Sequence, residues 1–288
     1  MAAALLVTFL WSSSWVLIRF GMRDHALEPF GFAALRYGAA AVVLMAIGLT
    51  PTRRRRLGSL TRRDLYNLVG LGIVFYGVTQ GSQFVAIGAQ PAATTSLILS
   101  LTPLVVGLAS MAMIGERPAK RQLLGTGLIA LGAAFYSAGE LGATRVGIIA
   151  ALIGLGANSA SALMGRVVNR AGAMTAYVVT AVSMTVGATA LAITALAIEG
   201  GIPVPDPEAW LIIFWLAVVN TALAFTLWNW SLSRLHATES AALNNTMTIQ
   251  IALLAWLFLS EALGPGEIAG ILLVTAGILL AHRRWAGS

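Results

Sequence analysis

The chain has 288 residues, of which 58% are hydrophobic and only 10% are charged, and its formal net charge is +7 at pH 7. A soluble domain carries about 25% charged residues, so this chain has too little charge to cover a water-facing surface and must lie largely in lipid. The basic residues stand in short connections between apolar runs and not on a folded polar face, which argues against nucleic-acid binding. The sequence contains no cysteine, which excludes disulfides and thiolate metal sites.

Ten apolar runs are long enough to cross a bilayer, which takes about 20 residues of helix. In chain order they cover residues 3–21, 30–50, 65–86, 91–114, 121–138, 146–166, 173–197, 209–231, 238–259 and 266–282. Prolines such as Pro29, Pro51, Pro91 and Pro118 fall at or near the ends of these runs, where a missing backbone donor is tolerated. The first run lacks the basic region of a cleaved signal peptide, so we expect a permanent span. The sequence therefore predicts an all-α integral membrane protein with ten transmembrane helices.

The second half of the sequence repeats the first with an offset of 145 residues and no gaps. The offset places Gly115-Glu116-Arg117 on Ser260-Glu261-Ala262, Gly125 on Gly270, and Gly132 on Gly277. Each half contains five predicted crossings, and because five is odd the second copy must run in the opposite orientation. We therefore predict two five-helix repeats, residues 1–143 and residues 144–288, with the second inverted.

The distribution of basic residues also favours inversion. Connection 51–63 holds six arginines, whereas its repeat mate 196–208 holds no Lys or Arg. All but four of the 18 basic residues fall on one predicted side, the exceptions being Arg19, Arg23, Arg36 and Arg145. The positive-inside rule makes that side cytoplasmic, together with both termini. Chance clustering of arginines is the alternative.

No enzyme signature is found in the sequence. His25, His236 and His282 share no metal-ligand spacing, and no glycine-rich phosphate loop with its lysine is present. Asp64 and Glu239 stand at the first turns of predicted spans, where a carboxylate caps a helix. We therefore expect a protein that is not an enzyme, with no metal, no cofactor and no obligate ATPase partner. The lack of a mid-span acid favours a facilitator over a proton relay.

Two arginines fall inside predicted spans. Arg19 lies near the end of the first run, where a long side chain can snorkel to the interface, and we expect it to do so. Arg36 lies about two turns into the second run. Because intramembrane charge is usually functional, Arg36 either ties helix ends together or meets a substrate carboxylate.

Polar and aromatic residues form matched stripes in the two halves. Tyr76, Gln80 and Gln83 recur at helical spacing, and the offset places Thr221, Phe225 and Trp228 on them. Polar groups in hydrocarbon must find partners, so these faces turn inward, either for helix packing or toward a cavity. The matched pattern favours a substrate-binding cavity. Its predicted lining is Ser13, Trp15, Arg36, Tyr76, Gln80, Gln83, Asn158, Ser159, Phe225, Trp228 and Asn244.

The fifth and tenth runs are instead rich in glycine, which lets helix backbones approach closely. Their glycines are Gly125, Gly127, Gly132, Gly266, Gly270 and Gly277. We expect these two helices to support the fold and not to line the cavity.

Two stretches of the sequence resemble a known half-repeat. The first runs from Pro91-Ala92-Ala93-Thr94 through Pro103 to Gly115-Glu116-Arg117, and the second from Ala237-Thr238-Glu239-Ser240 to Ser260-Glu261-Ala262. They are similar to the EamA half-repeat, and the resemblance covers the whole chain. It indicates the EamA-type transporters of the drug/metabolite transporter superfamily, and within them the YddG-like aromatic amino-acid exporters. Thr248 replaces the equivalent of Pro103, which is a departure from the pattern.

This resemblance implies a fold of ten helices in inverted repeats and alternating access through a central cavity. It also implies a bacterial inner-membrane exporter of amino acids, aromatic and other apolar ones preferred, and of related metabolites. Its partners would be a small-molecule substrate and the lipid bilayer, and a monomer is compatible with it. One alternative is efflux of cationic drugs or toxic compounds, which an acidic residue in the cavity would favour. The other is a non-transporting membrane component.

Overall fold

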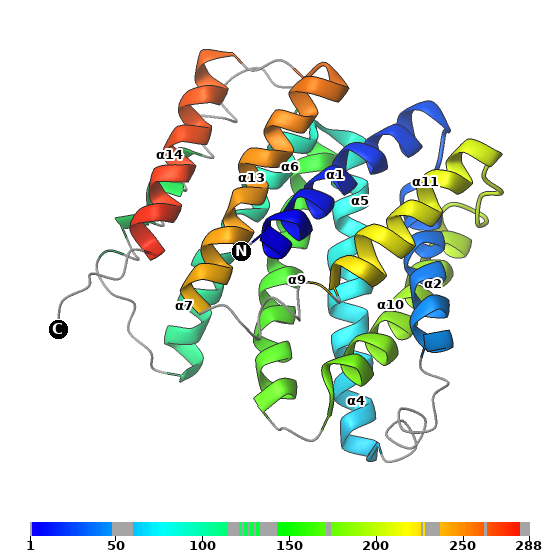
Figure 1. Ribbon diagram of the computed structural model, residues 1–288. Helices are drawn as coiled ribbons and strands as arrows, with labels where there is room; N and C mark the ends of the chain where they lie inside the picture. The colour runs from blue at the N-terminus through cyan, green and yellow to red at the C-terminus, as the bar shows by residue number, and fades with distance from the viewer. Residues whose placement is uncertain are drawn as a thin grey trace.

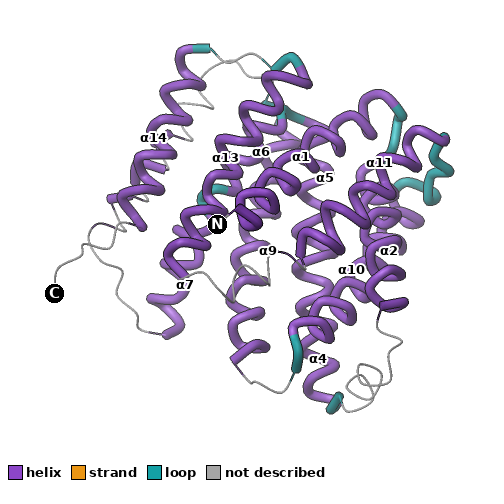
Figure 2. Tube along the Cα trace, viewed as in Figure 1, coloured by secondary structure: helices purple, strands orange, loops and turns teal. Residues whose placement is uncertain are grey.

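The structure, a computed structural model, describes residues 2–47, 60–114, 121, 124–125, 127–129, 131–132, 143–170, 174–225, 227, 237–261 and 264–282. Every regular element in these ranges is a helix, as Figure 2 shows. Helices α13 and α14 lie side by side at one flank of the bundle, and α2 and α10 pack together at the other (Figure 1). Helix α1 lies between the two flanks.

The helices follow the predicted spans closely. They are α1 (Ala2–Asp24), α2 (Pro29–Ile47), α4 (Arg62–Leu71), η1 (Gly72–Gln80), α5 (Gly81–Ala89), α6 (Ala92–Leu99), α7 (Thr102–Ile114), α9 (Arg145–Arg170), α10 (Ala176–Ile198), α11 (Pro207–Ala217), η2 (Val218–Leu223), α13 (Ala237–Leu259) and α14 (Pro265–His282).

Six helices of the described chain are long and apolar enough to cross a membrane. They are Ala2–Asp24, Pro29–Ile47, Arg62–Ala89, Ala92–Ala109, Arg145–Gly165 and Tyr177–Ile198. Three shorter apolar helices, Pro207–Leu223, Thr246–Leu259 and Ile268–Gly277, fall on further predicted spans. Most of the predicted span 121–138 lies outside the described residues, so the total of ten stays a prediction.

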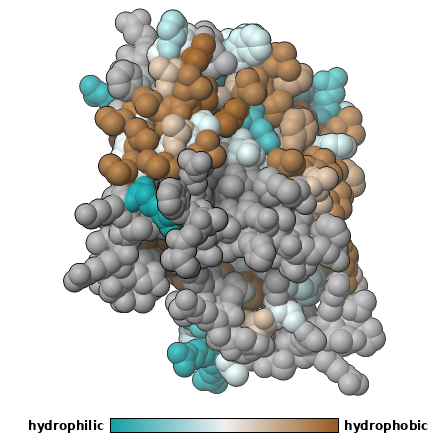
Figure 3. Space-filling model, turned by 60° about the vertical axis from the view of Figure 1, so that its left-hand side comes forward, coloured by the Kyte–Doolittle hydropathy of each residue, from teal (hydrophilic) through white to brown (hydrophobic). Residues whose placement is uncertain are grey.

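The surface of the described chain agrees with a lipid environment. Large apolar side chains such as Val42, Leu152, Leu211 and Phe214 are exposed on the outside of the bundle. Figure 3 shows apolar residues over most of the described surface in its upper part, with a smaller number of hydrophilic ones among and around them. Exposed apolar area of this extent, together with the six apolar helices that are long enough to span, agrees with a multi-pass membrane protein.

Two of the spans contain a π-helical segment, which the sequence did not predict. Segment η1 interrupts the helix formed by α4 and α5, and η2 follows α11. The Thr79 hydroxyl donates to the Val74 carbonyl at 2.9 Å, and that of Thr221 to the Leu216 carbonyl at 2.8 Å. Both of these side-chain bonds span five residues, which is consistent with the wider π turn. With the 145-residue offset, η2 falls within η1, so the same span is widened in both halves; π turns are frequent at functional sites.

Helix ends carry the caps expected of them. Thr61 and Asp64 form a capping box at the start of α4, which confirms the capping role predicted for Asp64. Asp206 caps α11 by accepting a hydrogen bond from the Ala209 N–H at 2.8 Å. That bond, together with His25, holds the pKa of the Asp206 carboxyl below its ordinary value. The side chain of Glu239 lies outside the described residues.

Glycines bring α14 against the described part of the predicted fifth span. A Cβ added to Gly132 would lie 2.7 Å from the Gly270 carbonyl oxygen, and one added to Gly277 would lie 2.5 Å from that of Gly125. These two contacts exchange under the 145-residue offset, since Gly132 maps onto Gly277 and Gly125 onto Gly270. They confirm the predicted close packing of these helices.

A glycine of α10 similarly allows η1 to pack against that helix. A Cβ on Gly187 would collide with the Tyr76 side chain and would lie 2.6 Å from the Gly72 carbonyl oxygen. Because both neighbours include backbone or the rigid base of a side chain, neither can move aside easily. Gly187 therefore fixes the position of Tyr76 and of the π-helical segment.

We expect Gly187→Ala to lower the stability of the folded protein by about 1–3 kcal/mol, the usual cost of overpacking. Thermal unfolding of purified protein in detergent measures the effect. Gly156→Ala is the matched control, because no atom lies within 4 Å of a Cβ added to Gly156 of α9. Equal melting temperatures for the two variants would contradict the proposed role of Gly187.

Candidate substrate-binding site

A buried asparagine on η2 joins the second half of the chain to α1. The Asn220 Nδ2 group donates to the Leu10 carbonyl at 2.6 Å and lies 2.8 Å from Ser14 Oγ and 3.2 Å from Ser13 Oγ. Its side chain is fully buried. The Asn220 Oδ1 atom is buried without a hydrogen-bond partner in the described part of the chain. Ser13 was predicted for the site, whereas Asn220 was missed although it directly precedes the stripe residue Thr221.

A glutamine on α13 makes the corresponding contact on the other side of α1. The Ser12 hydroxyl donates to Gln250 Oε1 at 3.0 Å, and Gln250 Nε2 donates to Thr8 Oγ1 at 3.3 Å. Gln250 Nε2 also lies 3.3 Å from Thr246 Oγ1 on its own helix. Helix α1 is thus held by side-chain amides of the second half, from η2 on one side and from α13 on the other.

Arg36 of α2 points toward η2. Its side chain is 6% exposed, and its Nε and Nη2 groups both lie 3.4 Å from the hydroxyl of Thr221. The guanidinium carbon stands 5.1 Å from the centre of the Tyr37 ring, a cation–π distance. Within the described residues no carboxylate forms an ion pair with Arg36.

The next residue of α2, Tyr37, contacts the stripe on η1. Its hydroxyl donates to Gln80 Oε1 at 2.6 Å, and its ring centre lies 5.6 Å from that of Tyr76. Tyr76 and Thr221 occupy equivalent positions in the two repeats. Arg36 and Tyr37 therefore reach the same position on η2 and η1, and the predicted residues Arg36, Tyr76 and Gln80 come together here.

Other predicted residues lie elsewhere in the bundle. Trp15 is buried in the same apolar cluster as Tyr37. Asn158 donates to Thr102 Oγ1 at 3.1 Å, and the Ser159 hydroxyl donates to the Leu155 carbonyl at 2.7 Å, so both are satisfied on or near α9. No described contact joins either of them to Arg36.

Of the four remaining predicted residues, the structure describes the side chains of two. The Phe225 ring lies with its centre 5.2 Å from that of Trp11 on α1, tilted by 57°, and Gln83 is half-buried on α5. Trp228 and the side chain of Asn244 lie outside the described residues. The polar residues of α1, η1 and η2 thus do turn inward, while a common cavity for all of the predicted residues stays a prediction.

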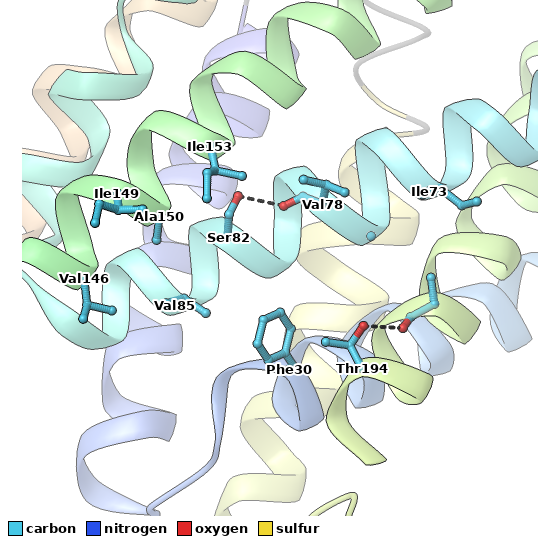
Figure 4. A pocket seen from close by; sticks show the side chains of 12 residues that line it. Phe30, Ile73, Val78, Ser82, Val85, Val146, Ile149, Ala150, Ile153 and Thr194 are labelled. Carbon is cyan, nitrogen blue, oxygen red and sulfur yellow. Dashed lines mark hydrogen bonds between the residues drawn. The ribbon is translucent and has the colours of Figure 1, made fainter. Parts of the chain in front are cut away.

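A pocket of about 530 Å³ lies between α5, η1, α9 and α10 (Figure 4). None of the predicted residues lines it. Its walls include Ile149 and Ile153, which are 59% and 51% exposed, so it opens on the lipid-facing surface. Ser82 and Thr194 donate their hydroxyls to the carbonyls of Val78 and Ala190, at 2.7 and 2.9 Å. The pocket therefore offers no free hydroxyl to a polar solute.

Three acidic residues of the second half, Glu199, Asp206 and Glu261, make contacts with the first half at one end of the bundle. We call the end defined by these three residues the Glu261 end. Glu199 accepts hydrogen bonds from the N–H groups of Phe30 and Gly31 at 2.7 and 2.8 Å. Glu261 accepts from Ala92 at 3.0 Å and Ala93 at 3.4 Å. Both carboxylates thus sit at positively polarised helix N-termini of the first half.

The third tie at the Glu261 end joins His25 Nδ1 to Asp206 Oδ2 at 2.7 Å. Like the two glutamate contacts, it links a residue of the second half to one of the first. The three ties cover the junctions that follow α1, α5, α10 and α13. The two halves are therefore closely joined at this end.

Arg19 supports the same end from within the first half. Its Nη1 group donates to the carbonyls of Ile87, Gly88 and Gln90, the latter two at 2.9 and 3.0 Å. These are carbonyl groups at the end of α5 that lack partners within the helix. The snorkelling of Arg19 to the interface stays a prediction, and its described partners are these carbonyls at a helix end.

Comparisons with known proteins agree with this architecture. The profile of the EamA-like transporter family matches residues 1–138 and, a second time, residues 145–283. The probable terminal-alkyne amino-acid exporter of Streptantibioticus cattleyicolor is 24% identical, over 99% of this chain and 94% of that protein. The uncharacterized transporter YoaV of Bacillus subtilis is 25% identical, over 95% and 93%. A solved crystal structure, described only as that of a protein, has the same fold, with a TM-score of 0.69 and 20% identity over 98% of this chain and 96% of that one.

We expect Asn220→Ala to destabilise the protein by about 1 kcal/mol, because the bonds from η2 to α1 are lost inside the bilayer. Thermal unfolding in detergent measures the loss. Asn158→Ala is the control, since the side chain of Asn158 makes one hydrogen bond within the described residues, to Thr102. An Asn220→Ala protein that melts at or above the temperature of the control would contradict the bridging role.

Proposed function

Because the chain belongs to the EamA-like transporter family, we propose that it exports amino acids, with aromatic and other apolar ones preferred, and related metabolites. The family and the relatives are transporters and not enzymes. The amino-acid substrate is supported by the relative whose name states amino-acid export. The preference for aromatic solutes is supported by Trp15, Tyr37 and Tyr76, which are buried among the central helices.

The observation that carries this proposal is the meeting of polar groups from both halves inside the spans. Asn220 bonds Ser13 and Ser14, and Arg36 bonds Thr221, all away from the helix ends. Polar side chains are costly in hydrocarbon, and where they gather they mark substrate pathways. The polar surface between the halves is therefore the path that we assign to the solute.

We further propose that residues 1–143 and 144–288 form two inverted repeats that move against each other. The double family match and the exchanged glycine contacts of Gly132 and Gly277 support this symmetry. The ties at the Glu261 end support a state that is closed there. The arginines at the start of α4 lie at the opposite end, so the positive-inside rule makes the Glu261 end external and both termini cytoplasmic.

In this path the aromatic faces of Trp15, Tyr76 and Trp228 would hold the side chain of the solute. Gln80, Asn158 and Ser159 would meet its polar groups. Efflux of cationic drugs is the other candidate function, and it would need an acidic partner in the path. The described side chains include no acid away from the helix ends, and the buried arginine would repel a cation.

Proteoliposomes loaded with labelled phenylalanine, methionine or threonine test the proposed function. We expect release of phenylalanine and methionine above that of empty liposomes, because an apolar side chain fits the aromatic lining. A quaternary ammonium compound in the same assay tests the alternative. Failure to release any of the three amino acids would overturn the proposal.

We also expect the combined Glu199→Gln and Glu261→Gln variant to open the Glu261 end more often. A neutral amide loses the attraction to the helix N-terminus and one of the two acceptor oxygens. Since the chain contains no cysteine, Ser13→Cys gives a unique labelling site for a membrane-impermeant maleimide added from outside. We expect labelling several-fold faster in the variant than in the Ser13→Cys parent.

Glu208→Gln is the matched control for this experiment, because Glu208 is exposed in the first turn of α11 and takes no part in the ties. It should label at the parent rate. Identical rates in all three proteins would remove the two glutamates from the closure.

A further inference from the structure

Arg36 is a buried charge without a counter-charge. Its side chain is more than nine-tenths buried, and the ion pairs of the described residues are Arg23 with Asp24 and His25 with Asp206. A charge removed from water is stable only when it is paired or fully hydrogen-bonded. The described protein supplies neither to Arg36.

The contact with Thr221 does not satisfy the guanidinium. Both Nε and Nη2 share the single Thr221 hydroxyl oxygen, each at 3.4 Å, which is long for an N–H···O bond. That hydroxyl donates its own hydrogen to the Leu216 carbonyl at 2.8 Å. A guanidinium has five N–H donors in a planar fork, so most of them have no acceptor in the described chain.

The surroundings of Arg36 are suited to a solute with an anionic end. The fork of an arginine matches the two oxygens of a carboxylate. Tyr37 and Tyr76, which stand beside it, present aromatic surface, and Gln80 presents a neutral amide. None of these neighbours carries a charge, so the site would be neutralised by a bound anion.

The position of Arg36 also fits a binding site behind the closed end. Glu199 holds the first turn of α2 through Phe30 and Gly31. Arg36 follows Phe30 by six residues, which places it about 9 Å further along the helix axis. A solute bound there would lie on the inner side of the closure.

We propose that Arg36 binds the carboxylate of the transported solute. This rests on the proposed function and sharpens it, since the substrate class becomes apolar or aromatic molecules that carry a carboxylate. Amines, amides and esters without that group are excluded. Thr221 positions the guanidinium, whose central carbon lies over the ring of the neighbouring Tyr37.

Competition in proteoliposomes tests the proposal on the unchanged protein. Unlabelled phenylalanine, 3-phenylpropionate, phenylalaninamide and phenethylamine compete against efflux of labelled phenylalanine. We expect the two carboxylates to compete and the amide and amine to be at least tenfold weaker. Equal competition by phenylalaninamide and phenylalanine would overturn the proposal while leaving amino-acid export intact.

Substitutions of Arg36 test whether this residue causes the preference for carboxylates. Arg36→Gln should abolish the preference for carboxylates, and Arg36→Lys should retain part of it, because a lysine keeps the charge without the fork. Arg23→Gln is the control, since Arg23 pairs with Asp24 at the surface. A folded Arg36→Gln protein with the preference of the wild type would overturn the assignment.

A binding measurement separates this proposal from the proposed function. If none of the three labelled amino acids is transported, amino-acid export fails. Thermal stabilisation of the detergent-purified wild type by 3-phenylpropionate, compared with stabilisation by its amide, then tests whether the protein has the proposed carboxylate-binding site at Arg36. Stabilisation by the carboxylate alone supports the anion site, and equal or absent stabilisation overturns it.

Discussion

Hydrocarbon provides no hydrogen-bond partners, and this constraint explains how the described helices are joined. Hydroxyl groups of serine and threonine satisfy it within their own helix, as Thr185 does by donating to the Ala181 carbonyl at 2.8 Å. A side-chain amide has too many donors and acceptors for that solution. Asn220 and Gln250 therefore reach across to α1, and the contact between the two halves is built around them.

The same constraint acts at the helix ends, where backbone groups lack partners. Glu199, Glu261 and Arg19 satisfy such groups with charge, so the Glu261 end is joined by a few directional contacts. The glycine contacts of α14 with Gly125 and Gly132 are van der Waals contacts between backbones. Contacts of the first kind can separate when the carboxylate finds water or a proton, whereas close backbone packing favours one arrangement. This difference is consistent with a polar path whose Glu261 end opens and closes, while the packing of α14 against the predicted fifth span stays fixed.

Hydropathy and residue spacing predicted the helices, the cap at Asp64 and the glycine packing, because each of these leaves a local signal. The π-helical segments were missed, since a hydrophobic stripe in one or two turns does not distinguish a π turn from an α turn. The partners of Glu199 and Glu261 were missed because a carboxylate that binds backbone N–H groups has no sequence signature in its partner. Within the candidate site, Arg36, Tyr76 and Gln80 were correctly turned inward. Asn158 and Ser159 were placed with them because they are polar residues inside a predicted span that match those of the first span, and their described contacts lie on and beside α9.

Arg36 differs from the other arginines of the first half that the structure describes within or beside the spans. Arg19 donates to backbone carbonyls, and Arg23 pairs with Asp24. In Arg36 the Nε and Nη2 groups share the hydroxyl oxygen of Thr221, and that hydroxyl already donates its hydrogen to a backbone carbonyl. A buried charge without a counter-charge lowers the stability of the folded protein. A solute that brings its own carboxylate would remove that cost only while it is bound. The unfavourable energy of the empty site would then add to the selectivity for carboxylates over amides of the same shape, because only the former complete the ion pair.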